Sequence, residues 1–254
     1  MHLHKKKKRQ EESKFIIEGV RLCHDALLSD WETEQAFVAE DFTTSERWEQ
    51  FSELFKLKKI PWRALPRPHF NRLADTETPQ GVLMIMRMPS YPATLFDPRK
   101  TSFVVALQGI RDPGNLGTII RTADWYGAAA AILSADCVDP FNPKVLRSTM
   151  GSIFQLPVYS APDLTEEIQR LKARGFQVIA SVLSGDKILK KMQFQRPVVL
   201  LLGGEAQGIS ADLTALADAR VRIWKYGRAE SLNVAIAGGI FMDHIASQIS
   251  RTKG

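Results

Sequence analysis

Five short apolar runs, separated by stretches of helical character, constrain the fold of residues 103–254 more than any other feature. The runs are 103–107, 128–133, 176–180, 198–202 and 221–223, and the helical stretches are 116–126, 164–174 and 231–249. Strands that are apolar throughout and alternate with helices are typical of a parallel sheet covered on both faces. The sequence therefore predicts an α/β domain whose ligands bind beyond the carboxyl ends of the strands.

A proline-rich segment at 88–101 separates this region from a smaller one. In the smaller region, 17–28 and 45–55 are expected to be helices, the second capped by Ser45, and 36–39 and 82–86 to be strands. Four aromatic residues are expected to pack in its core, namely Trp31, Phe37, Trp48 and Phe51. The predicted division is a flexible basic tail at 1–14, a small α/β domain at 15–88, a linker at 89–101 and a larger domain at 102–254.

Composition narrows the classes of function. The net charge of +6, with five cations at 5–9, suggests a polyanionic partner. No apolar stretch approaches the ~18–20 residues that span a bilayer, and no signal-peptide core follows the basic start, so we expect a cytoplasmic protein without a membrane partner. Cys23 and Cys137 lack metal-ligand spacing, so we expect both to be buried and reduced and expect no metal site.

The first of three polar loops at strand ends is QGIRDPGNLGTIIRTA, at 108–123. Asn115 can cap the helix that follows, and Arg121 lies where its side chain can reach back toward the loop. An arginine there can grip a phosphate or carboxylate or stabilise an oxyanion. On spacing alone, a surface salt bridge is the more ordinary interpretation of Arg121. The glycines match neither a dinucleotide fingerprint nor a Walker A loop.

The second loop is LLLGGEAQGI, at 200–209. The adjacent glycines Gly203 and Gly204 permit the backbone to approach a ligand closely, and Gly208 completes a tight turn. Glu205 follows a buried strand, so it is either a charge near a helix N-terminus or a functional acid beside the pocket.

The third loop leads into the helix at 231–249, where Ser231 and Asn233 stand at or near the start. Helix capping is the ordinary explanation for such residues. Small residues make one stretch of this helix thin, which suits close packing against another element or another subunit. They are Ala235, Ala237, Gly238 and Gly239.

Together the three loops resemble, in order and separation, the three motifs of the SpoU (TrmH) family of RNA 2′-O-ribose methyltransferases. The matching residues are Asn115, Gly117, Arg121, Thr122 and Ala123; Gly203, Glu205 and Gly208; and Ile223, Gly227, Ser231, Leu232 and Asn233. The segment DPFNPKVLRSTMGSIFQLPV at 139–158 also resembles the family, so the likeness covers 103–250. The segments FIIEGVRLCHDAL and NRLADTETPQGVL resemble, more loosely, an L30e-like RNA-binding domain.

The resemblance implies an α/β fold with a deep C-terminal trefoil knot, a homodimer, and S-adenosylmethionine as cofactor. Backbone groups would hold the cofactor at Gly203, Gly204, Gly208, Ile223 and Leu232. The implied reaction is methylation of a ribose 2′-hydroxyl, with ribosomal RNA as the expected substrate. Transfer RNA is one alternative, and a ribosome-associated RNA-binding protein without turnover is another. One departure stands out, because the family usually has Pro and Met where this chain has Trp224 and Lys225.

The resemblance also implies residue roles. It assigns the catalytic position to Arg121, and because a guanidinium stays protonated in proteins, we interpret it as stabilising a developing alkoxide or gripping a phosphate. Asn115, Ser231 and Asn233 would orient the ribose and the arginine, and Glu205 would fix the arginine or the loops.

Overall fold

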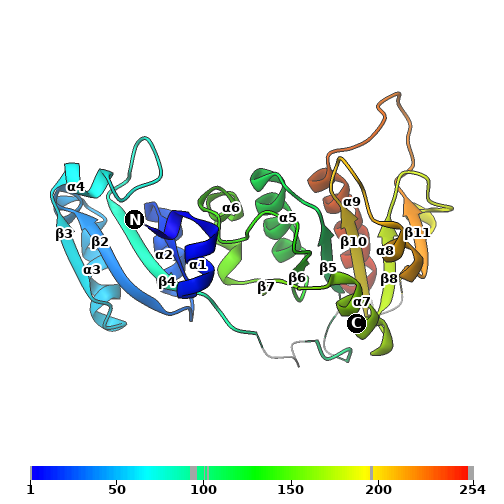
Figure 1. Ribbon diagram of the computed structural model, residues 1–254, viewed down its shortest axis with the longest axis horizontal. Coiled ribbons are helices and arrows are strands. Elements are labelled where there is room, and N and C mark those ends of the chain that lie inside the picture. Colours follow the sequence, from blue (N-terminus) through cyan, green and yellow to red (C-terminus); the bar gives the residue numbers. More distant parts are fainter. Residues whose placement is uncertain (1, 92–95, 100, 102, 195–196, 251–254) are drawn as a thin grey trace. The chain divides into compact units, whose positions relative to one another are not determined.

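The computed structural model describes residues 2–91, 96–99, 101, 103–194 and 197–250, which form two compact units (Figure 1). Unit 1 comprises Met1–Ser90 and Phe141–Gln155, and unit 2 comprises Tyr91–Pro140 and Leu156–Gly254. Unit 1 thus includes a segment from the middle of the chain. The predicted division into two domains with a linker at 89–101 stays a prediction, and that linker lies partly outside the described residues.

The sheet of unit 2 has seven strands in the order β7-β6-β5-β10-β8-β11-β9, and every pairing in it is parallel, which confirms the predicted α/β class. The strands are β5 (Phe103–Gln108), β6 (Ala131–Leu133), β7 (Val158–Ser160), β8 (Gln177–Ser181), β9 (Lys187–Ile188), β10 (Val198–Gly203) and β11 (Ala219–Arg222). β7 and β9 were not expected, because two or three residues give no recognisable apolar run.

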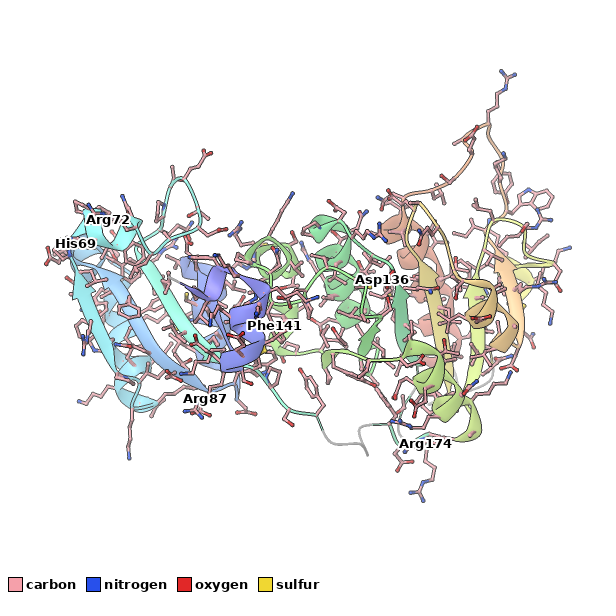
Figure 2. All side chains as sticks on the ribbon, in the orientation of Figure 1. His69, Arg72, Arg87, Asp136, Phe141 and Arg174 are labelled. Carbon is pink, nitrogen blue, oxygen red and sulfur yellow. The ribbon has the colours of Figure 1, made fainter. Side chains whose placement is uncertain are left out.

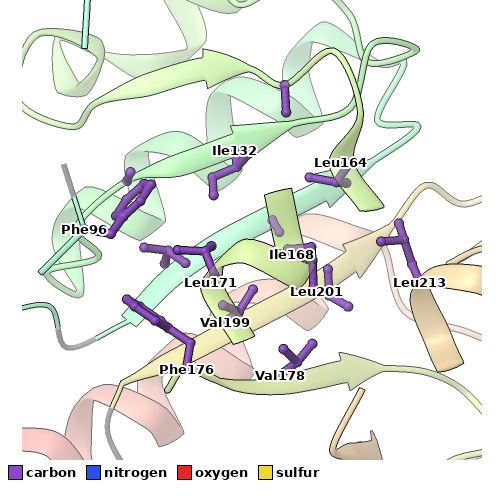
Figure 3. Close-up of a cluster of buried hydrophobic side chains, with 14 of the residues drawn as sticks. Phe96, Ile132, Leu164, Ile168, Leu171, Phe176, Val178, Val199, Leu201 and Leu213 are labelled. Carbon is purple, nitrogen blue, oxygen red and sulfur yellow. The ribbon is translucent and has the colours of Figure 1, made fainter. Parts of the chain in front are cut away.

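Helices cover both faces of this sheet. They are α5 (Pro113–Trp125), α7 (Leu164–Ala173), α8 (Ala211–Leu216), α9 (Val234–Ser250) and the short η4 (Leu189–Lys191). On one face, Ile168 of α7 and Leu213 of α8 join a buried cluster with Leu201 of β10 (Figure 3). Successive strand residues point to opposite faces, so Leu202 lies on the other face, against Gly238 of α9. A Cβ at Gly238 would stand 2.9 Å from Leu202 Cδ1, so the thin helix does pack closely.

The sheet of unit 1 has four strands in the order β1-β4-β2-β3, with β3 at an edge and parallel to β2. The strands are β1 (Lys14–Glu18), β2 (Thr33–Ala39), β3 (Trp62–Leu65) and β4 (Val82–Arg87). The helices are η1 (His2–His4), α1 (Lys6–Glu12), α2 (Val20–Leu28), η2 (Glu40–Thr44), α3 (Trp48–Leu57), α4 (Arg67–Asn71), α6 (Pro143–Thr149) and η3 (Ser152–Phe154).

Two helix starts in unit 1 differ from expectation. Ile17 lies in β1, and α2 begins only after Gly19, whose φ of +101° separates strand from helix. Ser45 does not cap α3, since its hydroxyl donates to the Phe42 carbonyl at 2.7 Å and ends η2. The first junction lies inside an apolar run, whereas the second joins a short 3₁₀ helix to α3 through polar residues.

Residues 2–12, expected to belong to a flexible tail, form η1 and α1. The Arg9 side chain is buried, and its guanidinium donates to the carbonyls of Leu3 at 3.0 Å and His4 at 2.8 Å. These bonds satisfy a buried charge with backbone acceptors, which accounts for the order of the segment.

Aromatic packing links β1 with the segment 141–155 inside unit 1. The rings of Phe15 and Phe141 are 4.7 Å apart, and those of Trp31 and Phe154 meet edge to face at 5.2 Å. Of the four aromatics expected in the core, Phe51 is buried, whereas Trp31, Phe37 and Trp48 are half-buried. Cys23 and Cys137 are buried and free, as predicted. In the part of the chain that the structure describes, no helix is long and apolar enough to cross a membrane.

Candidate active site

The main pocket of unit 2 lies at the carboxyl end of the parallel sheet, where Gln108 of β5 pairs with Gly203 of β10. Its volume is about 280 Å³, and its walls are the loops that follow these two strands together with the start of α9. This is the edge at which parallel sheets bind ligands. Its lining includes 108–112, Asn115, Asp136, 204–208, Ser210 and Val234.

The paired glycines allow close backbone contacts, Gly203 within the loop after β10 and Gly204 between that loop and the loop after β5. A Cβ on Gly203 would stand 2.2 Å from the Gly208 carbonyl carbon, and one on Gly204 would stand 2.2 Å from the Gly109 carbonyl oxygen. The Gly204 amide donates to the Gln108 carbonyl at 2.8 Å. The side of Gly203 and Gly204 on which a side chain would stand is therefore filled by the chain's own backbone, and Gly208, with φ +65°, makes the turn.

Three predicted site residues, Asn115, Glu205 and Asn233, form hydrogen bonds with one another beside these loops. Asn233 Nδ2 donates to Glu205 Oε1 and to Asn115 Oδ1, both at 2.9 Å, and Asn115 Nδ2 donates to Glu205 Oε1 at 3.2 Å. They come from α5, the loop after β10, and the residue before α9. A carboxylate that accepts two amide N–H groups holds all three segments in register.

Asn233 also caps a helix. Asn233 Oδ1 accepts from the amides of Ala235 at 2.9 Å and Ile236 at 3.4 Å, so the predicted cap of α9 is confirmed. The expectation for Asn115 was wrong, because Asp112 caps α5 and accepts from the Asn115 amide at 2.7 Å. The Asn115 side chain is thereby free to join Glu205.

Variants of Asn233 can distinguish its role as the cap of α9 from its hydrogen bonds to Asn115 and Glu205. Asn233→Ala should lower the free energy of unfolding by about 1 kcal/mol through the lost cap. Asn233→Asp keeps the cap acceptor but sets a second carboxylate beside Glu205, and adding Glu205→Gln should restore a donor–acceptor pair. Denaturant unfolding and methyl transfer would be measured together. A double variant no better than Asn233→Asp in both would contradict the coupling.

Two other predicted catalytic residues lie outside this network. Arg121 is exposed on α5, Ser231 is exposed before α9, and neither side chain makes a hydrogen bond or ion pair with the described residues. Arg121 lies beside Thr122, whose methyl carbon is 3.7 Å from where a Cβ on Gly239 of α9 would stand. The packing of α5 on α9 thus fixes the base of the arginine side chain while its guanidinium stays available.

Sequence reasoning missed Asp136 and Gln108. Asp136 lines the pocket (labelled in Figure 2), and its carboxylate accepts from the Ser134 hydroxyl, which in turn accepts from the Gly109 amide at 3.0 Å. Gln108 Oε1 accepts from the Ser210 amide at 2.8 Å. Both residues follow or end buried strands, so the rule on carboxyl ends of parallel strands was the available signal.

The loop after β11 leaves its backbone groups free of hydrogen bonds to the other described segments. Between 224 and 232 no backbone N–H or C=O forms a hydrogen bond with the backbone of other described residues. Leu232 is 46% exposed, and the Arg222 guanidinium lies 5.1 Å from the centre of the Trp224 ring. Free backbone donors and acceptors beside apolar side chains fit an adenosine group. Gly203, Ile223 and Leu232 are absent from the lining of the main pocket, whereas Gly204 and Gly208 belong to it.

Known proteins resemble this chain along most of its length. The SpoU rRNA Methylase family matches residues 102–243, and the MRM3-like substrate binding domain matches residues 1–84. The 23S rRNA (guanosine(2553)-2′-O)-methyltransferase RlmP of Bacillus subtilis is 33% identical over 243 residues, or 96% of this chain and 92% of the relative. An AdoMet-bound rRNA methyltransferase from Sinorhizobium meliloti has a TM-score of 0.86 at 34% identity, covering 96% and 91% of the two chains.

The SpoU methyltransferase AviRb from Streptomyces viridochromogenes, solved with AdoMet, has a TM-score of 0.87 at 27% identity over 99% of this chain and 96% of its own. Fold, pocket position and these likenesses place the protein in the class of S-adenosylmethionine-dependent RNA methyltransferases. Because the matching model spans more than half of its residues, the chain belongs to the SpoU rRNA Methylase family. The family predicted from the three loops is confirmed, while the knot stays a prediction.

Proposed function

We propose that this protein methylates a ribose 2′-hydroxyl in the RNA of the large ribosomal subunit, in the cytoplasm. The observation that carries the proposal is the Asn115–Glu205–Asn233 network at the carboxyl end of the sheet. It is supported by RlmP, named as a 23S rRNA 2′-O-methyltransferase, which matches both units of this chain. Solved structures named for tRNA match only 59% and 63% of the chain, at 23% identity, and show the fold alone.

The proposed roles follow from what each side chain can do. S-adenosylmethionine supplies an electrophilic methyl group, and backbone groups at Gly203, Gly204, Gly208, Ile223 and Leu232 would hold it. Arg121 would stabilise negative charge on the 2′-oxygen or grip the adjacent phosphate. Asn115, Ser231 and Asn233 would orient the ribose, and Glu205 would keep Asn115 and Asn233 in place. Most of the rate gain would come from positioning.

The test uses purified protein, isotopically labelled S-adenosylmethionine, and unmodified ribosomal or transfer RNA, followed by nuclease digestion and mass spectrometry of the nucleosides. A labelled 2′-O-methylnucleoside from ribosomal RNA is expected. Label in transfer RNA alone would overturn the substrate, and a methylated base would overturn the acceptor. Binding of RNA without binding of cofactor would favour a protein without turnover.

We also propose that α5 and α9 form the contact of a homodimer. Three large apolar side chains stand exposed on these packed helices, with Trp125 at 84%, Ile236 at 56% and Ile240 at 39%. Apolar surface gathered on neighbouring helices favours burial against a partner. Ile236 and Ile240 lie one turn apart, so they share a face of α9.

The substitution Ile236→Glu should convert a dimer into a monomer, because a charge buried in an apolar contact is strongly disfavoured. Light scattering after size-exclusion chromatography would measure the mass. Leu183→Glu, at a side chain that is 74% exposed on unit 2, is the matched control and should leave the mass unchanged. A wild-type protein of about 28.5 kDa in solution would rule the dimer out.

A further inference from the structure

Two segments of residues 1–88 carry an excess of positive charge, namely 5–9 and 56–72. Residues 56–72 contain six Lys and Arg and no Asp or Glu, whereas the rest of 1–88 contains nine Lys and Arg against fourteen Asp and Glu. This segment runs from the end of α3 through β3 and α4. We name as the β3 basic edge the six residues Lys56, Lys58, Lys59, Trp62, Arg63 and Arg72.

Trp62 and Arg63 of the β3 basic edge lie on β3, at the open side of the unit 1 sheet, and the other four residues lie in the segments just before and after this strand. β3 pairs with β2 alone, and its first three residues are exposed. Cations on an edge strand are one way in which proteins prevent edge-to-edge aggregation. That purpose does not account for Trp62, since a 42% exposed indole at the start of the edge strand would favour association.

Four of the five cations of the β3 basic edge are available to a ligand, and the exception is Lys58. Arg67, in the same segment, is paired with Asp41, and Lys58 Nζ donates to the Ser29 carbonyl. Among the residues that the structure describes, Lys56, Lys59, Arg63 and Arg72 have no carboxylate partner. Arg72 lies near His69 at the α4 end of the unit (Figure 2).

The Trp62 ring is held in place. It packs edge to face on Trp48 of α3, with 4.8 Å between ring centres and 69° between planes. An aromatic ring that is fixed yet partly exposed loses little freedom when a flat group stacks on it.

We propose that the β3 basic edge binds a single-stranded stretch of RNA, with phosphates on its cations and a base stacked on Trp62. Stacking on a fixed aromatic ring beside a basic groove is how proteins hold unpaired nucleotides. A peptide strand could instead pair with the free backbone of β3, but that mode needs neither the cations nor the indole. The inference rests on the proposed function, because it assumes that the substrate is RNA.

The experiment measures binding without turnover. Fluorescence anisotropy of the full chain would use a labelled 20-nucleotide RNA single strand and a 20-base-pair RNA duplex. The single strand should bind more tightly. Trp62→Ala should weaken its binding by about tenfold, while Trp62→Phe, which keeps a stacking ring, should stay within about threefold of wild type.

A triple variant, Lys56→Ala with Arg63→Ala and Arg72→Ala, tests the cations. The slope of log affinity against log salt should fall by about 0.7 for each phosphate that the protein no longer neutralises. A charge-matched control removes three cations from unit 2, namely Arg174, Lys187 and Lys191, and should change the slope little. Equal effects of the two triple variants, or unchanged binding by Trp62→Ala, would overturn this inference alone. No binding of either RNA by wild type would overturn the proposed function as well.

Discussion

Arg121→Ala is expected to lower kcat for RNA methylation by about 10²- to 10³-fold, while the Kd for S-adenosylmethionine stays within about twofold. Side chains on a helix tilt toward its N-terminus, and α5 begins at the pocket, so the Arg121 side chain extends toward the end of α5 where we propose that the ribose binds. It has no hydrogen-bond or ion-pair partner among the described residues, so its loss should disturb the fold little.

Arg121→Lys refines this test. Lysine keeps the charge but loses the planar fork of donors, so a large loss is expected here too. Single-turnover kinetics with ribosomal RNA would give the rate, and calorimetry would give the cofactor Kd. Arg174→Ala, between α7 and the start of β8 at the amino end of the sheet, is the control and should behave as wild type (Arg174 and Asp136 of the pocket are labelled in Figure 2). Turnover retained by Arg121→Ala would remove this residue from the mechanism.

Gly204→Ala is expected to lower the free energy of unfolding by about 3 kcal/mol and to abolish methyl transfer. The new Cβ would stand 2.2 Å from the Gly109 carbonyl oxygen, which is backbone and cannot move aside as a flexible side chain would. The loops after β5 and β10 would have to separate, and with them Asn115 and Glu205.

A midpoint of thermal unfolding about 6–12 °C lower than wild type would correspond to that loss. Gly239→Ala is the matched control, since the Thr122 methyl carbon would stand 3.7 Å from its new Cβ, at an ordinary packing distance. Alanine in the interior of α9 should stabilise it by about 0.5–1 kcal/mol. Equal midpoints for Gly204→Ala and wild type would mean that the loops can separate without cost.

Much of unit 2 was predictable because its signals are local. Strands such as β5 and β10 are apolar throughout, which distinguishes a buried parallel strand from an amphipathic one, and the loops that follow them carry the polar residues. The short β7 and β9 escaped prediction because their pairing partners, rather than their own sequence, make them strands.

Unit 1 was less predictable, since β1 runs into α2 with only Gly19 between them and no change in hydrophobicity. Trp62 and Arg63 of β3 also gave no alternating pattern, because an edge strand exposed on both sides needs none. Arg9 belonged by composition to a basic tail, and the tertiary structure buries its side chain with backbone acceptors at Leu3 and His4.

By itself the sequence determined the parallel α/β class, the family, and the residue types at the strand ends, because apolar periodicity and motif order are properties of neighbouring residues. Only the tertiary structure decided that Asn233 caps α9 while bonding Glu205 and Asn115, and that Asp112 caps α5. Asn115 and Asn233 are 118 residues apart, and a hydrogen bond over that separation depends on how the strands between them are ordered in the sheet.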